Sequence, residues 1–325
     1  EAIKLPQVQG VADKSFQVLN KAMDDYLKES DKKEEKKKEF SPELTLILFE
    51  EPEAFLHPTQ QELLNMNLRE ISTDLNQQII CSTHSATFVS KNIESLPCLL
   101  KVVRNGGVSS IFQITSGELD ALFDSNNSMF QMFSEKLIDT SVDQSVKLEI
   151  ARRNLGSIST DESVKLEEES LKYFLWLDSE RSCSFFAKHV IICEGATEKV
   201  LLDHLLNTIW RDLKVKHLYF LDSMGKYNIH RYMNLFCELG IYHSIIYDKD
   251  QDQGIHELIN SFINAKKNAY TKGVYTFNQD IEEYLGISAP NRNDLKPLSI
   301  IWNYKNNKID KTKIDELRGI LESLL

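Results

Sequence analysis

Two apolar runs that end in acidic residues decide the fold: His189-Val-Ile-Ile-Cys193 leads into Glu194-Gly-Ala-Thr-Glu198, and Ser244-Ile-Ile-Tyr247 leads into Asp248-Lys-Asp250. Short apolar runs of this kind are typical of buried strands. Helical patterns alternate with them and with a third run at 217–221, so the sequence predicts βαβ units and a parallel sheet flanked by helices. Because ligands of such sheets bind at the carboxyl ends of the strands, we expect the acids to gather at one edge.

Four carboxylates, Glu194, Glu198, Asp248 and Asp250, form the candidate catalytic site. Neighbouring carboxylates repel one another unless a cation lies between them, so the pattern predicts a metal site. With a helix that begins after Gly195, Glu194 and Glu198 are four residues apart and would share one face. Asp248 and Asp250 reach the same pocket only if the chain turns after the second run. Oxygen-only ligation favours Mg²⁺ or Mn²⁺, and two ions about 4 Å apart would activate a nucleophile and stabilise a leaving oxygen.

The turn Asp222-Ser-Met-Gly225-Lys226 follows the third run and is a further candidate. Asp222 or Ser223 could join the shell of a metal ion, and Gly225 could let backbone amides approach a phosphate. The alternative is an ordinary strand-to-helix turn in which Ser223 caps the helix. Farther along the chain, Lys296 is a candidate because a lysine near a scissile phosphate stabilises the charge of the transition state.

A second constellation lies nearer the amino terminus, where a strand at 44–49 runs into Glu50-Glu-Pro-Glu-Ala-Phe-Leu-His-Pro58. This string resembles the Walker B strand of ABC-type, SMC-like ATPase heads. The resemblance implies that Glu50, in place of the usual Asp, holds Mg²⁺, and that Glu51 orients and polarises the attacking water. His84, in Ser82-Thr-His-Ser85 after the next strand, resembles the switch histidine that contacts the γ-phosphate.

Only half of an ATP site is present in this sequence. It contains no G-x-x-x-x-G-K-[ST] motif, and Gly10-Val-Ala-Asp-Lys14-Ser15 has too short a loop to replace one. No clear ABC signature motif precedes the Walker B strand either. We therefore expect the other half of the ATP site in sequence upstream of residue 1.

The composition is that of an ordinary globular protein, with 325 residues, 42% hydrophobic residues and a formal net charge of −11. This charge argues against a protein that coats nucleic acid, although a local basic groove remains compatible with it. A helix is expected at 15–27, and the charged run at 31–39 is read as a solvated helix end or loop. No apolar run approaches the roughly 20 residues that span a bilayer. We expect a fragment of a cytoplasmic protein with reduced cysteines and no membrane contact.

Together the motifs resemble the OLD family (overcoming lysogenisation defect), in which an ABC-type ATPase head precedes a Toprim domain. A Toprim domain carries the metal-dependent phosphodiester site of topoisomerases, primases and some nucleases. The resemblance implies an α/β fold with three parts: the C-terminal part of an ATPase domain at 1–115, a helical connector at 116–185, and a Rossmann-like Toprim nuclease domain at 186–325. It also implies Glu194, Glu198, Asp248 and Asp250 as metal ligands, Glu282 or Glu283 as a further acid, and Lys296 as the catalytic lysine.

Two functions are compatible with these residues. The first is a DNA endonuclease or nickase that uses Mg²⁺ or Mn²⁺, is regulated by ATP, and acts in antiphage defence. The family implies a dimer, tetramer or other homo-oligomer, and the partner could be a helicase-like subunit or a retron reverse transcriptase with its nucleic acid. The alternative is a nucleotide-dependent DNA-binding clamp or scaffold whose Toprim domain does not cleave; the four intact acids favour the first function.

Overall fold

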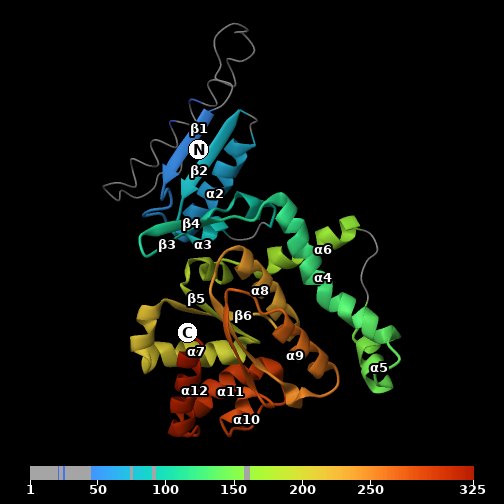
Figure 1. Cartoon of the computed structure of the whole chain (residues 1–325). Helices are drawn as coiled ribbons and strands as arrows, with labels where there is room; N and C mark the ends of the chain where they lie inside the picture. Colours follow the sequence, from blue (N-terminus) through green and yellow to red (C-terminus); the bar gives the residue numbers. More distant parts are fainter. Residues whose placement is uncertain (1–20, 22–24, 26–44, 74–75, 90–92, 157–161) are drawn as a thin grey trace. The chain divides into compact units, whose positions relative to one another are not determined.

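The computed structural model describes residues 21, 25, 45–73, 76–89, 93–156 and 162–325 (Figure 1). Two compact units divide the chain, Glu1–Ser90 and Lys91–Leu325. Of the helix expected at 15–27, only Lys21 and Asp25 are described, and both are helical. The short loop at 10–15 and the charged run at 31–39 lie outside the described residues.

The first unit contains a parallel pair of strands, β1 (Thr45–Glu50) and β2 (Gln77–Ser82), joined by the helix α2 (Pro58–Ser72) and followed by α3 (Ala86–Val89). The expected strand–helix–strand order is thus confirmed. Leu64 and Leu68 of α2 pack against the sheet. Because the two strands run in parallel register, their carboxyl ends, Glu50 and Ser82, lie side by side.

The second unit is built around a four-stranded parallel sheet in the order β6-β5-β7-β8. Its elements are the strands β5 (His189–Cys193), β6 (Leu218–Asp222), β7 (His243–Asp248) and β8 (Thr271–Phe277), and the helices α7 (Ala196–Thr208), α8 (Ile229–Glu238), α9 (Ile255–Ala265), α10 (Ile281–Tyr284), α11 (Lys296–Lys305) and α12 (Lys311–Ser323). The three apolar runs of the sequence are three of these strands. The fourth strand, β8, was not predicted, because most of its residues are only half-buried and its apolar pattern is weak.

Alternate residues of the strands pack on opposite faces of this sheet. Ile191 of β5, Phe220 of β6 and Ile246 of β7 share one core with the apolar residues of α7, α11 and α12. The neighbouring β5 residues point to the other face, where α8 contacts β5 and β7. Figure 1 shows α8 and α9 on the side away from α7, α11 and α12. Both faces are therefore covered, as the continuous apolar strands require.

The strands β3 (Lys101–Asn105) and β4 (Val108–Phe112) form a hairpin with Gly106 and Gly107 at positive φ in its turn. It belongs to the second unit, however, whereas the sequence placed it in a first part that reached residue 115. The physical reason lies in Phe112. Its ring packs edge-on against Tyr270 at a centroid distance of 6.0 Å and covers the backbone of Gly240, which follows α8.

The segment expected as a helical connector is helical, with α4 (Ser116–Ile138), α5 (Gln144–Arg152) and α6 (Glu162–Trp176). Rather than standing apart, it packs on α8 through a buried polar network. The Arg231 guanidinium lies 3.0 Å from Glu169 of α6, and His230 Nε2 lies 2.9 Å from the carbonyl of Asn126 in α4. Since buried charges are stable only when paired, this network fixes α4 and α6 to the sheet domain.

None of the helices in the described ranges is both long enough and apolar enough to cross a bilayer.

Candidate active site

Glu194 lies directly after β5, at the centre of the carboxyl edge of the sheet. Its amide donates to the carbonyl of Ile246 in β7 (3.1 Å), and its Oε2 accepts from the amide of Asp248 (3.1 Å). The helix α7 begins only at Ala196. The predicted helix start after Gly195 is confirmed, but Glu194 precedes the helix, so it meets Glu198 at the junction of strand and helix and not on one helical face.

Glu198 is the third residue of α7, and its side chain bends back to accept from the amide of Gly195 (3.0 Å). The residue is buried, with 4% of its surface exposed. Burial, and then the negative charge of Glu194, raise the pKa of Glu198 above its ordinary value; Glu282 adds to the shift. The carboxyl group thus holds a proton more readily than a solvated glutamate does.

Asp248 is the last residue of β7, and its Oδ1 is buried without a hydrogen-bond donor among the described residues. Burial and then the charges of Glu198 and Glu194 raise its pKa strongly, with smaller contributions from Asp280 and Asp250. A buried carboxylate without donors is unfavourable as an anion. The site therefore carries excess negative charge that a proton or a cation would neutralise.

Asp250 lies in a different environment, because the chain turns sharply after β7. Asp250, Gln251 and Asp252 all have positive φ, and this left-handed turn meets the condition that the sequence set for Asp250 to approach Asp248. The Asp250 carboxylate forms an ion pair with Lys226 and lies 2.9 Å from His256 Nδ1. Although burial acts in the opposite direction, His256 and Lys226 lower the pKa of Asp250 to about 2.

Glu282 and Lys296 reach the same edge from the segment after β8. Glu282 is 1% exposed, and its Oε1 lacks a hydrogen-bond donor in the described part of the chain, while Lys296 Nζ lies 3.6 Å from it. Lys296 Nζ also lies 4.0 Å from Asp280, whose charge acts on Asp248. The structure thus brings both of these predicted residues near the acids.

Asp222 has protein partners of its own. Its Oδ1 accepts from the amide of Met224 (2.7 Å), and its Oδ2 lies 3.8 Å from Arg181. The hydroxyl of Ser223 donates to the carbonyl of Glu194 (3.0 Å), and the amide of Gly225 donates to the same carbonyl (2.7 Å). The segment is therefore better described as a strand-to-helix turn than as a metal-binding or phosphate-binding loop. The predicted cap by Ser223 is wrong, however, because α8 begins at Ile229 with Asn228 at its N-cap.

Three residues of the site were not among the predicted ones: Asp280, Lys226 and His256. Asp280 and Lys226 each follow a strand of the sheet, Asp280 three residues after β8 and Lys226 four residues after β6. Their position after strands was a usable signal for both, but β8 had to be recognised first. His256 gives no such signal, since it is an ordinary helix residue in sequence.

The donor set suits a hard divalent cation, because it consists of carboxylate oxygens, of which one on Asp248 and one on Glu282 are buried without donors. As the side chains stand, no three His, Cys, Asp or Glu residues within the described ranges surround a common point for a metal ion. Asp250 is engaged by Lys226 and His256, and Glu194 by a backbone amide. Metal binding would thus require these side chains to change partners.

In the first unit, the strand ends bring Glu51 to His84: Glu51 Oε1 lies 2.8 Å from His84 Nε2, and both side chains are substantially exposed. Glu50, the last residue of β1, is exposed as well. The sequence did not single out Glu53, which is 7% exposed and accepts from the Thr83 hydroxyl and from the amide of His84 (2.9 Å). Glu53 therefore fixes the backbone that carries the predicted switch histidine.

Comparison with known proteins agrees with this geometry. Residues 185–250 match the family described as "Overcoming lysogenization defect protein-like, TOPRIM domain". The chain has an OLD-like Toprim domain. Residues 24–89 match the family described as "AAA ATPase domain". Endonuclease GajA from Bacillus cereus (strain HuB5-5) is 25% identical over 257 residues, which cover 75% of this chain and 31% of that protein. These matches confirm the resemblance to the OLD family, and the chain spans about a third of the length of this relative.

The Toprim match covers five of the predicted acids: Glu194, Glu198, Asp222, Asp248 and Asp250. It ends before Glu282 and Lys296, which the structure places near these acids. The AAA match covers Glu50, Glu51 and His84.

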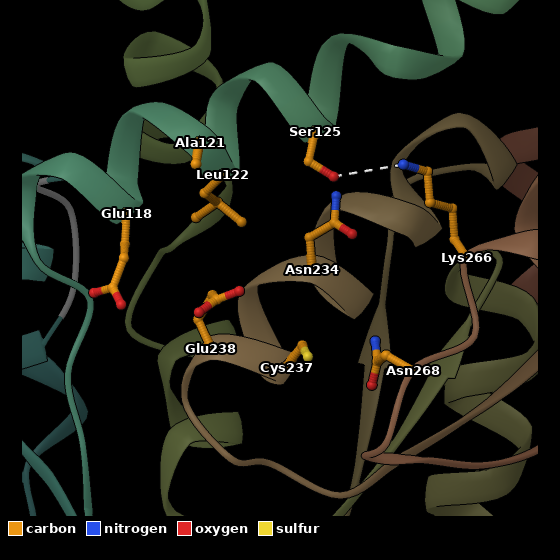
Figure 2. A pocket seen from close by; sticks show the side chains of 9 residues that line it. All are labelled: Glu118, Ala121, Leu122, Ser125, Asn234, Cys237, Glu238, Lys266 and Asn268. Carbon is orange, nitrogen blue, oxygen red and sulfur yellow. Dashed lines mark hydrogen bonds between the residues drawn. The ribbon is translucent and has the colours of Figure 1, made fainter.

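A small pocket of about 180 Å³ lies away from the Toprim acids, between α4 and the end of α8 (Figure 2). Figure 2 shows the carboxylates of Glu118 and Glu238 at one side and Lys266 reaching Ser125 at the other. None of the residues that line it belongs to the acidic site. We therefore assign it no part in the chemistry of that site.

Proposed function

We propose that this chain forms the Toprim part, with an accompanying ATPase segment, of a metal-dependent DNA endonuclease of the OLD family. The observation that carries the proposal is the convergence of Glu194, Glu198, Asp248 and Glu282 at one edge of the sheet, with buried oxygens on Asp248 and Glu282 that have no hydrogen-bond donor. Such a site gains most from a hard cation. The similarity to a protein named as an endonuclease supports the reaction class.

The roles follow from the environment of each side chain. Glu194, Glu198, Asp248, Asp250 and Glu282 would hold Mg²⁺ or Mn²⁺, which would activate water and neutralise charge on the phosphodiester. Asp222, also predicted as a ligand, would first have to give up the Met224 amide and Arg181.

Lys296 is suited to contact the substrate phosphate, because its ammonium lies at the acidic edge with a quarter of its side chain exposed. There it would stabilise the negative charge that grows in the transition state.

The ATPase segment would regulate cleavage. When ATP is bound, Glu50 would hold Mg²⁺, Glu51 would act on the attacking water, and His84 would contact the γ-phosphate. The remaining contacts to ATP would come from outside this chain. The 2.8 Å contact between Glu51 and His84 supports their acting together. An oligomeric assembly, a role in antiphage defence, and a helicase-like or reverse-transcriptase partner belong to the same proposal, on the strength of the family resemblance.

Cleavage of supercoiled plasmid tests this function. We expect the chain to nick or linearise the plasmid in Mg²⁺ or Mn²⁺, and expect Asp248→Asn and Glu194→Gln to reduce the rate at least about 100-fold. Asp315→Asn, which makes the same type of change at an exposed position on α12, is the matched control. Retention of plasmid without any cleavage, in either metal and with or without ATP, would favour the clamp or scaffold instead.

A further inference from the structure

Lys226 is a buried lysine inside the acidic site. Its side chain is 3% exposed, and its ammonium pairs with Asp250, lies 4.0 Å from Glu194 Oε2, and lies 5.6 Å from the centre of the Tyr247 ring. Removing an ammonium group from water is costly unless carboxylates and an aromatic face replace the water. The position of Lys226 is therefore tied to the presence of these acids.

The turn that precedes Lys226 is attached to the residue that the lysine faces. Met224 and Gly225 both have positive φ, which bends the chain back toward β5. The Gly225 amide and the Ser223 hydroxyl both donate to the carbonyl of Glu194. Because backbone and side chain of one turn converge on Glu194, the lysine is held in place and does not reach the acids by chance.

This arrangement divides the site into two unequal halves. On one side, the Asp250 carboxylate already has Lys226 and His256 as partners. On the other side, Asp248 and Glu282 each keep a buried oxygen without a hydrogen-bond donor in the part of the chain that the structure describes. On this side Lys296 Nζ lies 3.6 Å from Glu282 Oε1, so it is Asp248 that offers an entering cation an oxygen without a partner among the described residues.

We propose that Lys226 is a resident cation of the site, which holds the position of one divalent ion on the Asp250 side. The first ion then binds on the Asp248 side, and a second ion binds only when the ammonium moves away from Asp250. This inference rests on the proposed function, since it requires the acids to bind metal. Lys226 acts through Asp250 and Glu194 and is a positioning residue, so it sets the metal concentration at which the second position fills.

Calorimetric titration of the metal-free chain with Mn²⁺ tests the proposal. We expect one tight and one weaker ion in the natural sequence, and expect Lys226→Met to bind the second ion at least about tenfold more tightly, because a positive charge about 4 Å away has been removed. Lys226→Arg keeps the charge and should keep the original pattern. Lys267→Met, an exposed lysine of the same unit, should change nothing.

Two results separate the possible failures. If Mn²⁺ binds but Lys226→Met leaves the weaker affinity unchanged, or if two ions bind equally in the natural sequence, this inference is wrong and the nuclease proposal stands. If no Mn²⁺ binds to the natural sequence, both are wrong. If Lys226→Met fails to fold, the charge-balanced variant Lys226→Met/Asp250→Asn replaces it. This double variant should bind one Mn²⁺ as tightly as the natural sequence binds its tight ion. If the double variant binds no Mn²⁺, the inference is also wrong.

Discussion

Asp248 is the residue whose surroundings are most unfavourable in the absence of metal. Its buried oxygen has no donor among the described residues, and its pKa is raised by burial and by Glu198 and Glu194. The cost of this charge is carried by the folded state, since an unfolded chain would solvate it. A residue that destabilises the fold at neutral pH is typical of a functional site.

We therefore predict that Asp248→Asn stabilises the protein in EDTA, because a neutral amide replaces the unfavourable anion. A gain of roughly 1 kcal/mol would raise the Tm by about 2–4 °C for a unit of this size. Thermal unfolding measured with EDTA and with Mg²⁺ checks this, and the variant should also lose the stabilisation by Mg²⁺ that we expect for the natural sequence. Asp315→Asn should leave both values unchanged; a lower Tm for Asp248→Asn in EDTA contradicts the prediction.

The raised pKa values also predict how stability depends on pH. Glu198 and Asp248 have ordinary values of 4.5 and 3.8 and higher values in the fold, so the folded state binds more protons than the unfolded chain. This stabilisation is complete below pH 4 and is lost as the pH rises through the raised values.

Two buried histidines act outside the window in which this effect is seen, whereas Lys101, whose pKa is lowered by burial to about 8, opposes it at the upper end. Burial lowers the pKa of His189 and His243 to about 4, so these histidines destabilise the fold only as the pH falls below their ordinary value of 6.5. Between pH 7 and 8.5 we thus expect the metal-free Tm to fall and the stabilisation by Mg²⁺ to grow. Glu198→Gln should flatten both trends, and an equal slope in this variant would show that the acids are not responsible.

At the scale of elements, the hairpin of β3 and β4 is attached to the sheet domain by one aromatic contact. A Cβ at Gly240 would overlap the Phe112 ring, and Gly240 also has φ +60°. Gly286 has a similar φ of +71° but nothing within 4 Å of such a Cβ. A comparison of alanine substitutions at Gly240 and Gly286 therefore separates the cost of backbone strain from the cost of packing.

We predict that Gly240→Ala costs about 2–4 kcal/mol, because it combines left-handed strain of about 1 kcal/mol with overpacking of 1–3 kcal/mol. Gly286→Ala should show the strain alone. Urea unfolding of both variants measures the difference. Equal losses would mean that Phe112 moves aside at no cost and that the hairpin is not part of the second unit.

For the whole molecule, the division at Ser90 and Lys91 predicts that residues 91–325 fold without the preceding unit. We expect this shorter chain to keep its circular dichroism spectrum per residue, to unfold cooperatively, and to bind Mn²⁺ as the full chain does. A chain that begins at residue 116 lacks the hairpin, the buried side chains of Leu96 and Ile114, and the Thr115 cap of α4. It should be less stable by more than about 3 kcal/mol. Equal stability of the two shorter chains would favour the boundary near residue 115.

The sequence by itself determined the elements that depend on local pattern. Three of the four strands of the parallel sheet and the Toprim acids at their ends follow from short apolar runs that stop at polar residues. The fourth strand was missed because a half-buried strand lacks such a run. The start of α7 after Gly195 was predicted, because the glycine marks the turn from strand to helix.

Only the tertiary structure decided which charges compensate one another. Lys226, His256 and Asp280 come from three different segments, and no spacing in the sequence relates them to Asp248 or Asp250. Burial and proximity across the sheet edge leave Asp248 unpaired and Asp250 paired. These are properties of distance and solvent exclusion, which act between side chains far apart in the chain and leave no periodic pattern in its sequence.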